Sequence, residues 1–78
     1  MMMGDRIREV RNKRGWTLDD LAEASALSKG FLSDLENNKR DIGAGNLLLI
    51  ADALAVSLDY LVRGVVIKTK LFTFERKQ

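Results

Sequence analysis

The side chains that most often carry out enzyme chemistry are missing from this sequence. Its 78 residues include no histidine and no cysteine, which removes disulfides, thiolate nucleophiles, Cys/His zinc sites and the most common general base. Asp19 and Asp20 form the only local pair of carboxylates, but adjacent residues of a helix point about 100° apart, and no base accompanies them. We therefore expect that the chain is not an enzyme, holds no metal and uses no cofactor.

The charged side chains suit the binding of an anion, although the net charge is small. The formal net charge is +2 and is unevenly distributed: residues 1–40 hold 8 basic and 7 acidic side chains, residues 41–64 hold 1 and 3, and residues 65–78 hold 4 and 1. A small basic domain favours nucleic acid only weakly, because basic tails are common on solvated surfaces of every kind. Charge alone leaves both interpretations open.

The length and composition predict one small globular domain. A chain of 78 residues is too short for two cores, and a content of 46% hydrophobic and 31% charged residues is typical of a folded protein. The longest apolar run, 47–51, is far shorter than the roughly 20 residues that cross a bilayer, and the N-terminus has no apolar signal region. We expect a cytoplasmic protein with no membrane partner.

Helix signals recur along residues 5–64. Thr17 and Asp20, three positions apart, form a capping box. Ser28 and Ser57 are further N-caps, and Gly64 is a stop signal. With the apolar periodicity, these signals predict five short helices, at about 5–14, 17–25, 28–37, 44–54 and 57–64.

The third and fourth of these helices differ in their surfaces. At about 100° per residue, the apolar side of 28–37 consists of Phe31, Leu32 and Leu35. Its opposite side is small and hydrogen-bonding, and consists of Lys29, Gly30, Ser33, Asp34 and Asn37. The helix at 44–54 carries a broader apolar stripe, suited to the centre of a bundle, formed by Leu47, Leu48, Ile50, Ala51 and Leu54.

Residues 65–74 differ in composition from the residues before them. They are rich in β-branched and aromatic side chains, which predicts a C-terminal β-strand. A single strand leaves its amides and carbonyls unpaired, so we expect it to pair with the same segment of another copy. The residues assigned to this dimerisation arm are Ile67, Thr69, Leu71, Phe72 and Phe74. The alternative is a disordered basic tail.

Two short helices joined by a tight turn match the geometry that lays a helix in the major groove of DNA. The string GWTLDDLAEASALSKGFLSDLENNKR, followed by LLLIADALAVSLDYLVRG, resembles the phage-repressor and Cro-type (XRE-type) helix-turn-helix family over residues 5–64. The resemblance implies an all-α fold, a compact five-helix lambda-repressor-like DNA-binding domain. In it the helices at 17–25 and 28–37 form the helix-turn-helix, and the latter is the recognition helix.

The resemblance also implies two sets of DNA-contacting residues. The groove-facing set is Lys29, Gly30, Ser33, Asp34 and Asn37, in which Lys29 is able to donate to guanine O6 and N7. The phosphate-contacting set is Thr17, Ser28, Lys39, Arg40, Gly45 and Asn46. Three alternatives stay open. Thr17 is compatible with a plain N-cap, Lys39 and Arg40 with a solvated charge pair, and Ser33 and Asn37 with sugar and phosphate contacts alone.

Arg11 and Glu36 match a family ion pair that joins the first helix to the end of the third. Glu36 lies at the border of the apolar stripe, so we expect the pair to be partly buried and to fix the orientation of the recognition helix. Trp16, Phe31 and Tyr60 are interpreted as packing residues and not as ligands.

The sequence departs from the family pattern at several positions. Leu18 stands where the family usually has glutamine, so a polar DNA contact is absent there. Ala26 and Asn38 occupy turn positions that usually prefer glycine; asparagine tolerates positive φ, whereas alanine there is strained by about 1 kcal/mol. Asp34 places a negative charge on the side of the helix that is expected to face the DNA, which is a polyanion. It could accept from cytosine N4 or reject other bases by repulsion.

The function predicted from these patterns is that of a sequence-specific regulator of transcription that binds double-stranded DNA. We expect a homodimeric repressor at a palindromic operator, with 1–64 as the DNA-binding domain and 65–78 as the dimerisation arm. If the 78 residues are the whole protein, there is no room for a sensor domain after residue 64. The alternative is an antitoxin-like module of the same fold, whose tail captures an unknown protein.

Overall fold

The protein folds into five helices, and the structure, a computed structural model, describes residues 2–64. The helices are α1 (Met3–Lys13), α2 (Leu18–Ser25), α3 (Lys29–Glu36), α4 (Ala44–Leu54) and α5 (Leu58–Arg63). This confirms the all-α fold expected from the helix signals. The strand predicted at 65–74 and its residues Ile67, Thr69, Leu71, Phe72 and Phe74 lie outside the described part of the chain.

The helices begin where the predicted caps place them, apart from α1. The hydroxyls of Thr17, Ser28 and Ser57 accept hydrogen bonds from the backbone amides three residues further on, at the starts of α2, α3 and α5. The first helix begins at Met3, two residues before the predicted start, because the Asp5 carboxylate accepts a hydrogen bond of 3.1 Å from the Met2 amide.

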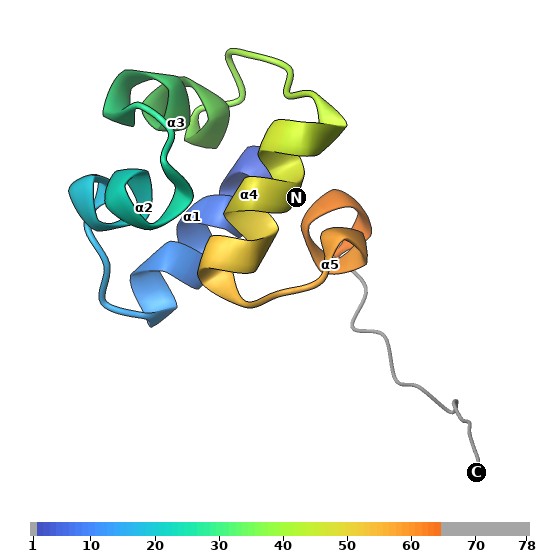
Figure 1. Ribbon diagram of the computed structural model, residues 1–78. Helices are drawn as coiled ribbons and strands as arrows, with labels where there is room; N and C mark the ends of the chain where they lie inside the picture. Colours follow the sequence, from blue (N-terminus) through green and yellow to red (C-terminus); the bar gives the residue numbers. More distant parts are fainter. Residues whose placement is uncertain (1, 65–78) are drawn as a thin grey trace, which may run out of the picture.

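The five helices enclose one apolar core. Figure 1 shows α2 and α3 on one side of the central α4 and α5 on the other. Helix α2 packs against α3 and α4, and α1 packs against α3 and α5. The buried apolar side chains come from every helix and are Ile7, Val10, Leu21, Leu32, Leu35, Leu47, Ile50, Ala51, Leu54 and Leu61. Trp16, Phe31 and Tyr60 pack against this core from its edge, as expected.

One residue of the predicted α4 stripe is not in the core. Leu48 is 47% exposed and its neighbour Leu49 is 44% exposed. The buried face of α4 is narrower than predicted, since Leu47, Ile50 and Leu54 already fill the contact with the neighbouring helices. Leu48 lies about 100° around the helix from Leu47 and faces outward.

Three residues other than glycine adopt the left-handed conformation. Ala26 (φ 63°) ends α2 and Asn38 (φ 58°) follows α3, as the turn positions predicted. Ala55 (φ 57°) ends α4 in the same way and was not foreseen. Alanine has no side-chain hydrogen bond to offset the crowding of its Cβ, so each of these alanines stores about 1 kcal/mol of strain.

Candidate nucleic-acid interface

Helices α2 and α3 are held together by a short turn and by packing on the core side of α3. Leu32, Leu35 and Glu36 are buried, while Lys29 and Gly30 are exposed and Ser33 and Asp34 are half-buried. Asn37, the C-cap residue, is exposed. The structure therefore places the five residues of the predicted groove-facing set on the outer side of α3.

The two hydroxyls of the predicted phosphate-contacting set act as N-caps. Thr17 Oγ1 accepts from the Asp20 amide at 3.1 Å, and the Asp20 carboxylate accepts from the Thr17 amide at 2.8 Å. Ser28 Oγ accepts from the Phe31 amide at 3.1 Å. A hydroxyl that accepts one hydrogen bond keeps its own hydrogen for donation. Capping and phosphate binding are thus compatible at both residues.

The cations near α3 are paired with carboxylates at the surface. Lys29 Nζ lies 3.5 Å from Asp19 Oδ1, which connects the start of α3 to α2. Arg40 Nε lies 3.9 Å from Asp34 Oδ2. Exposed ion pairs are worth only about 0 to 1 kcal/mol, so pairing leaves both cations available to a phosphate or a base. Within the described residues, Lys39 is exposed and its ammonium group has no side-chain partner.

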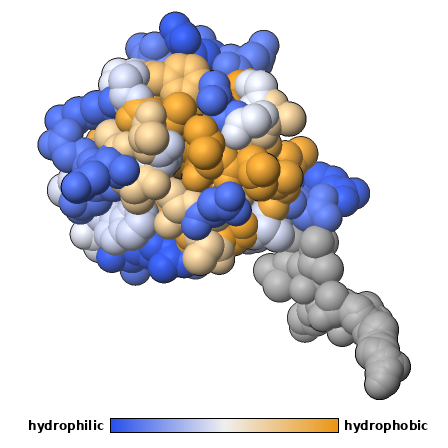
Figure 2. Space-filling model, in the orientation of Figure 1, coloured by the Kyte–Doolittle hydropathy of each residue, from blue (hydrophilic) through white to orange (hydrophobic). Residues whose placement is uncertain are grey.

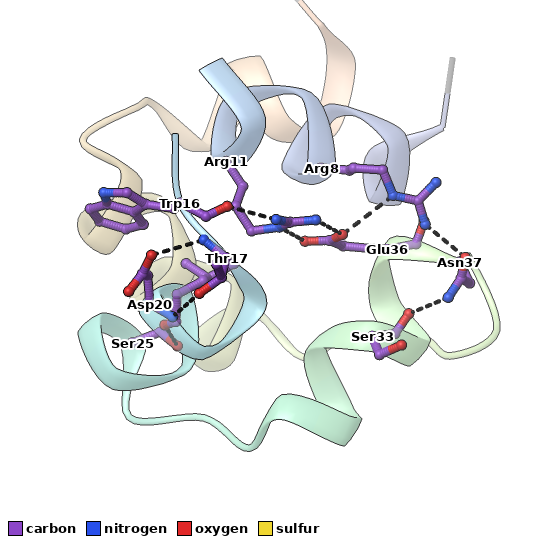
Figure 3. A network of polar contacts seen from close by, with 10 residues as sticks. Arg8, Arg11, Trp16, Thr17, Asp20, Ser25, Ser33, Glu36 and Asn37 are labelled. Carbon is purple, nitrogen blue, oxygen red and sulfur yellow. Dashed lines mark hydrogen bonds and ion pairs between the residues drawn. The ribbon is translucent and has the colours of Figure 1, made fainter. Parts of the chain in front are cut away.

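Two hydrogen bonds fix the orientation of the Asn37 side chain. Its amide nitrogen donates to the Ser33 carbonyl at 2.9 Å, and its Oδ1 accepts from Arg8 Nη2 at 2.7 Å. Figure 3 shows this carboxamide turned toward α1. One N–H of Asn37 remains for a further partner.

A buried ion pair anchors the end of α3 to α1 (Figure 3). Arg11 Nε donates to Glu36 Oε2 at 2.7 Å and Arg11 Nη2 donates to Glu36 Oε1 at 2.9 Å. The Glu36 side chain is only 2% exposed. Arg11 also donates to the Trp16 carbonyl at 2.7 Å, which brings the start of α2 into the same network. The structure thus joins the two residues assigned to the structural ion pair.

The contact with Glu36 favours the charged form of Arg11. Hydrogen bonding to Glu36 raises the pKa of Arg11 above its ordinary value, and the negative charge of Glu36 adds to this, whereas partial burial acts in the opposite direction.

Sequence reasoning missed two arginines of α1. Arg8 Nε lies 3.3 Å from Glu36 Oε1, which makes it a second partner of that carboxylate. Its spacing from Arg11, three residues along one helix face, is the signal that could have indicated it. Arg6 is buried and donates to the Leu61 and Val62 carbonyls at 2.8 and 2.6 Å, so it fixes the last turn of α5.

The remaining residues of the predicted phosphate-contacting set follow α3. Lys39 and Arg40 lie in the loop between α3 and α4, and Gly45 and Asn46 lie in the exposed first turn of α4 (Figure 1). The N-cap of α4, Gly43, offers no side-chain cap to the amides of that turn. These amides are hydrogen-bond donors without a capping acceptor, which is a favourable environment for an anion.

Residues 7–61 match the helix-turn-helix family. The chain belongs to this family. Its membership agrees with the expectation that the chain is not an enzyme, because the family consists of regulators of transcription. None of the helices in the part of the chain described above is long and apolar enough to cross a membrane.

The most similar relatives include regulators from two bacteria. The chain is 34% identical over 65 residues to the HTH-type transcriptional regulator DdrOP3 of Deinococcus deserti, covering 83% of this chain and 50% of the relative. It is 36% identical over 62 residues to the HTH-type transcriptional regulator ImmR of Bacillus subtilis, covering 80% of this chain and 49% of the relative. The chain thus spans about half the length of these curated relatives.

The fold is similar to that of a solved repressor on DNA. The P22 c2 repressor in complex with a synthetic operator superposes with a TM-score of 0.79 at 32% identity, covering 83% of this chain and 98% of that one. The all-α helix-turn-helix fold is therefore shown by family, relatives and structure together.

Proposed function

We propose that the chain is a sequence-specific DNA-binding repressor of transcription that lays α3 in the major groove. The observation that carries this proposal is the outer side of α3, a row of small polar side chains on a helix whose inner side is anchored in the core. The similar P22 c2 repressor, solved with a synthetic operator, supports the same use of the fold.

Only a few side chains on the outer side of α3 can recognise bases. Lys29 lies in the first turn of α3. On DNA its ammonium group leaves the Asp19 carboxylate and donates to guanine O6 and N7. Gly30 is exposed and has no side chain, and the space beyond its Cα is open, so the helix backbone could approach the bases closely there. Ser33 and Asn37 supply hydroxyl and amide groups further along the helix.

Phosphate contacts on either side of α3 set its orientation. Thr17 and Ser28 lie at the N-termini of α2 and α3, while Lys39 and Arg40 lie beyond the C-terminus of α3. Together with the amides of Gly45 and Asn46, they would hold two stretches of the DNA backbone. Neutralising phosphates also makes binding fall steeply as salt is raised.

Replacing Lys29 with alanine is expected to relax base preference. The variant should lose about 1 to 3 kcal/mol of discrimination at one base pair, because a neutral methyl group cannot donate to guanine. The measurement is the affinity for duplexes that differ at single positions of a site selected by the wild-type chain. Lys13→Ala is the control; it removes a charge from α1 and should leave the base preference unchanged. An unaltered preference for Lys29→Ala would show that α3 does not read the bases.

We propose further that residues 65–74 pair with the same segment of a second copy. An exposed apolar surface on the described residues supports an interface; it consists of Leu48 and Leu49 of α4 and Leu58 and Val62 of α5. Figure 2 shows apolar surface gathered over α4 and the adjoining side of α5. A twofold dimer would place two recognition helices about 34 Å apart, the repeat of one DNA turn, and so match a palindromic operator.

Deleting residues 65–78 is expected to convert the dimer to a monomer. The exposed apolar side chains of α4 and α5 alone are too few to hold two copies together. The measurement is sedimentation of the full chain and of the truncated chain at matched concentrations. A truncated chain that stays as dimeric as the full chain would rule out pairing through the tail. A full chain that is monomeric would favour a tail that captures a different protein.

A further inference from the structure

We propose that Asp34 and Phe31 are positioning residues, which hold the guanidinium of Arg40 beside the outer side of α3 so that it meets a DNA phosphate in the specific complex. This inference rests on the proposed DNA binding. It assigns Asp34 a task different from the reading or rejection of a base.

Two independent contacts converge on Arg40. Its Nε lies 3.9 Å from Asp34 Oδ2, and its Cζ lies 5.2 Å from the centroid of the Phe31 ring. Phe31 and Asp34 are three residues apart on one helix, so they are neighbours on its surface. A carboxylate and an aromatic face are the two partners that suit a planar cation.

The supports are fixed, although Arg40 itself belongs to a loop. Phe31 packs against the core, and Asp34 lies in the middle of α3. The loop turns back toward α3, because the Lys39 amide donates to the Asp34 carbonyl at 2.9 Å and Asn38 adopts a left-handed φ of 58°. Arg40 is therefore brought back over the helix that it follows in sequence.

Holding Arg40 in this place reduces the side-chain conformational entropy that Arg40 loses when it binds DNA. An arginine on a loop has many rotamers, and a partner that restricts them before binding lowers the penalty for the contact. At 3.9 Å the contact of Arg40 with Asp34 is an ion pair without a hydrogen bond, so the N–H donors of the guanidinium fork stay available for a phosphate. The Arg40 side chain is 53% exposed, which keeps it accessible.

The same pair neutralises an unfavourable charge. Asp34 alone would repel the phosphates that α3 approaches, and Arg40 compensates this repulsion. The effect of Asp34 on DNA binding must therefore depend on Arg40. With Arg40 present, Asp34 helps the specific complex; without Arg40, it hinders it. A residue that only selected bases would behave the same way in both cases.

The test is a double-mutant cycle on the full chain. The proteins are wild type, Asp34→Asn, Arg40→Ala and the double variant, and the probes are a duplex selected from random sequence by the wild-type chain and a scrambled duplex of equal length. We expect Asp34→Asn to weaken binding to the selected duplex on the order of threefold in the wild-type background, and to tighten it by a similar factor in the Arg40→Ala background. Asp34→Asn should tighten binding to the scrambled duplex in both backgrounds.

Two further variants separate positioning from folding. Phe31→Leu keeps apolar bulk against the core but removes the ring face, so it should weaken binding to the selected duplex when Arg40 is present and leave it unchanged in the Arg40→Ala background. Thermal unfolding of each variant confirms that the domain is folded. The matched control background is Lys39→Ala, which removes the adjacent cation; within the described residues its ammonium group makes no ion pair or hydrogen bond with α3. In the Lys39→Ala background, Asp34→Asn should still weaken binding to the selected duplex.

The outcomes distinguish this inference from the proposed function. If the wild-type chain binds no duplex, DNA binding itself is wrong and the inference fails with it. If the wild-type chain binds, but Asp34→Asn changes affinity in the same direction and by the same factor with and without Arg40, then DNA binding stands and the positioning role of Asp34 is overturned.

Discussion

Glu36→Ala is expected to lower the free energy of unfolding by about 3 to 5 kcal/mol, because it leaves the charge of Arg11 without its partner in a buried place. The carboxylate is 2% exposed and accepts from Arg11 through both oxygens, at 2.7 and 2.9 Å, with Arg8 as a further donor. A domain of this size is stable by only about 5 to 15 kcal/mol. The variant should therefore be close to unfolding at physiological temperature.

The measurement is urea unfolding of the full chain, with the midpoint and slope compared between variants. Glu9→Ala is the matched control, since Glu9 pairs with Lys13 on the surface of the same helix α1 at 3.9 Å and accepts only a long hydrogen bond, of 3.5 Å, from the Tyr60 hydroxyl. The control should change stability by no more than about 1 kcal/mol. A second variant, Arg11→Leu with Glu36→Leu, removes both charges and should recover part of the loss. Equal effects of Glu36→Ala and Glu9→Ala would contradict the anchoring role of the buried pair.

Gly4→Ala is expected to cost about 3 kcal/mol, the upper part of the usual range for overpacking. A Cβ at this position would overlap the Leu35 backbone oxygen and lie 2.5 Å from Asn38 Oδ1. The Gly4 amide also donates to Asn38 Oδ1 at 3.1 Å, so α1 and the end of α3 lie in direct contact. A side chain there must push the end of α3 outward, and with it the loop that carries Lys39 and Arg40.

The same unfolding experiment measures this effect, and affinity for the selected duplex measures the displacement of α3. For the unfolding measurement Gly45→Ala is the matched control, because nothing lies within 4 Å of a Cβ built at Gly45 in the first turn of α4. Alanine there should be neutral or should stabilise by up to about 1 kcal/mol. If Gly4→Ala proves as stable as Gly45→Ala, the close contact of α1 with α3 is wrong.

The helices were predictable from sequence because their signals are local. Thr17, Ser28 and Ser57 bond to amides three residues away, and a buried stripe repeats every three or four residues. The outer side of α3 was predictable for the same reason. Once Leu32 and Leu35 are assigned to the core, helical geometry decides which residues face away from it.

The contacts that fix the orientation of α3 were less accessible, because they join residues far apart in the chain. Arg8 meets Glu36 across 28 positions, and its spacing from Arg11 is the one local signal for that contact. Arg6, which fixes the last turn of α5, meets Leu61 across 55 positions, and no local pattern indicates it. Arg11 and Glu36 were foreseen only through resemblance to a family. The importance of Gly4 arises from the approach of another helix, which composition and periodicity do not report.

The pairing of Arg40 was missed for a related reason. Its ion pair with Asp34 depends on how the loop after α3 turns back, and a sequence pattern gives the turn residue Asn38 but not the direction of the side chain that follows. Asp34 therefore looked like an isolated anion, whereas the structure gives it a cationic neighbour.

Selection of bound duplexes from a random pool by the full chain shows whether the protein recognises a DNA sequence. We expect enrichment of one motif with twofold symmetry, whose half-sites are centred about 10 base pairs apart and whose binding weakens as salt is raised. A pool that shows no enriched motif after repeated rounds, or that binds the chain no better than unselected duplex, would contradict sequence-specific DNA binding through α3.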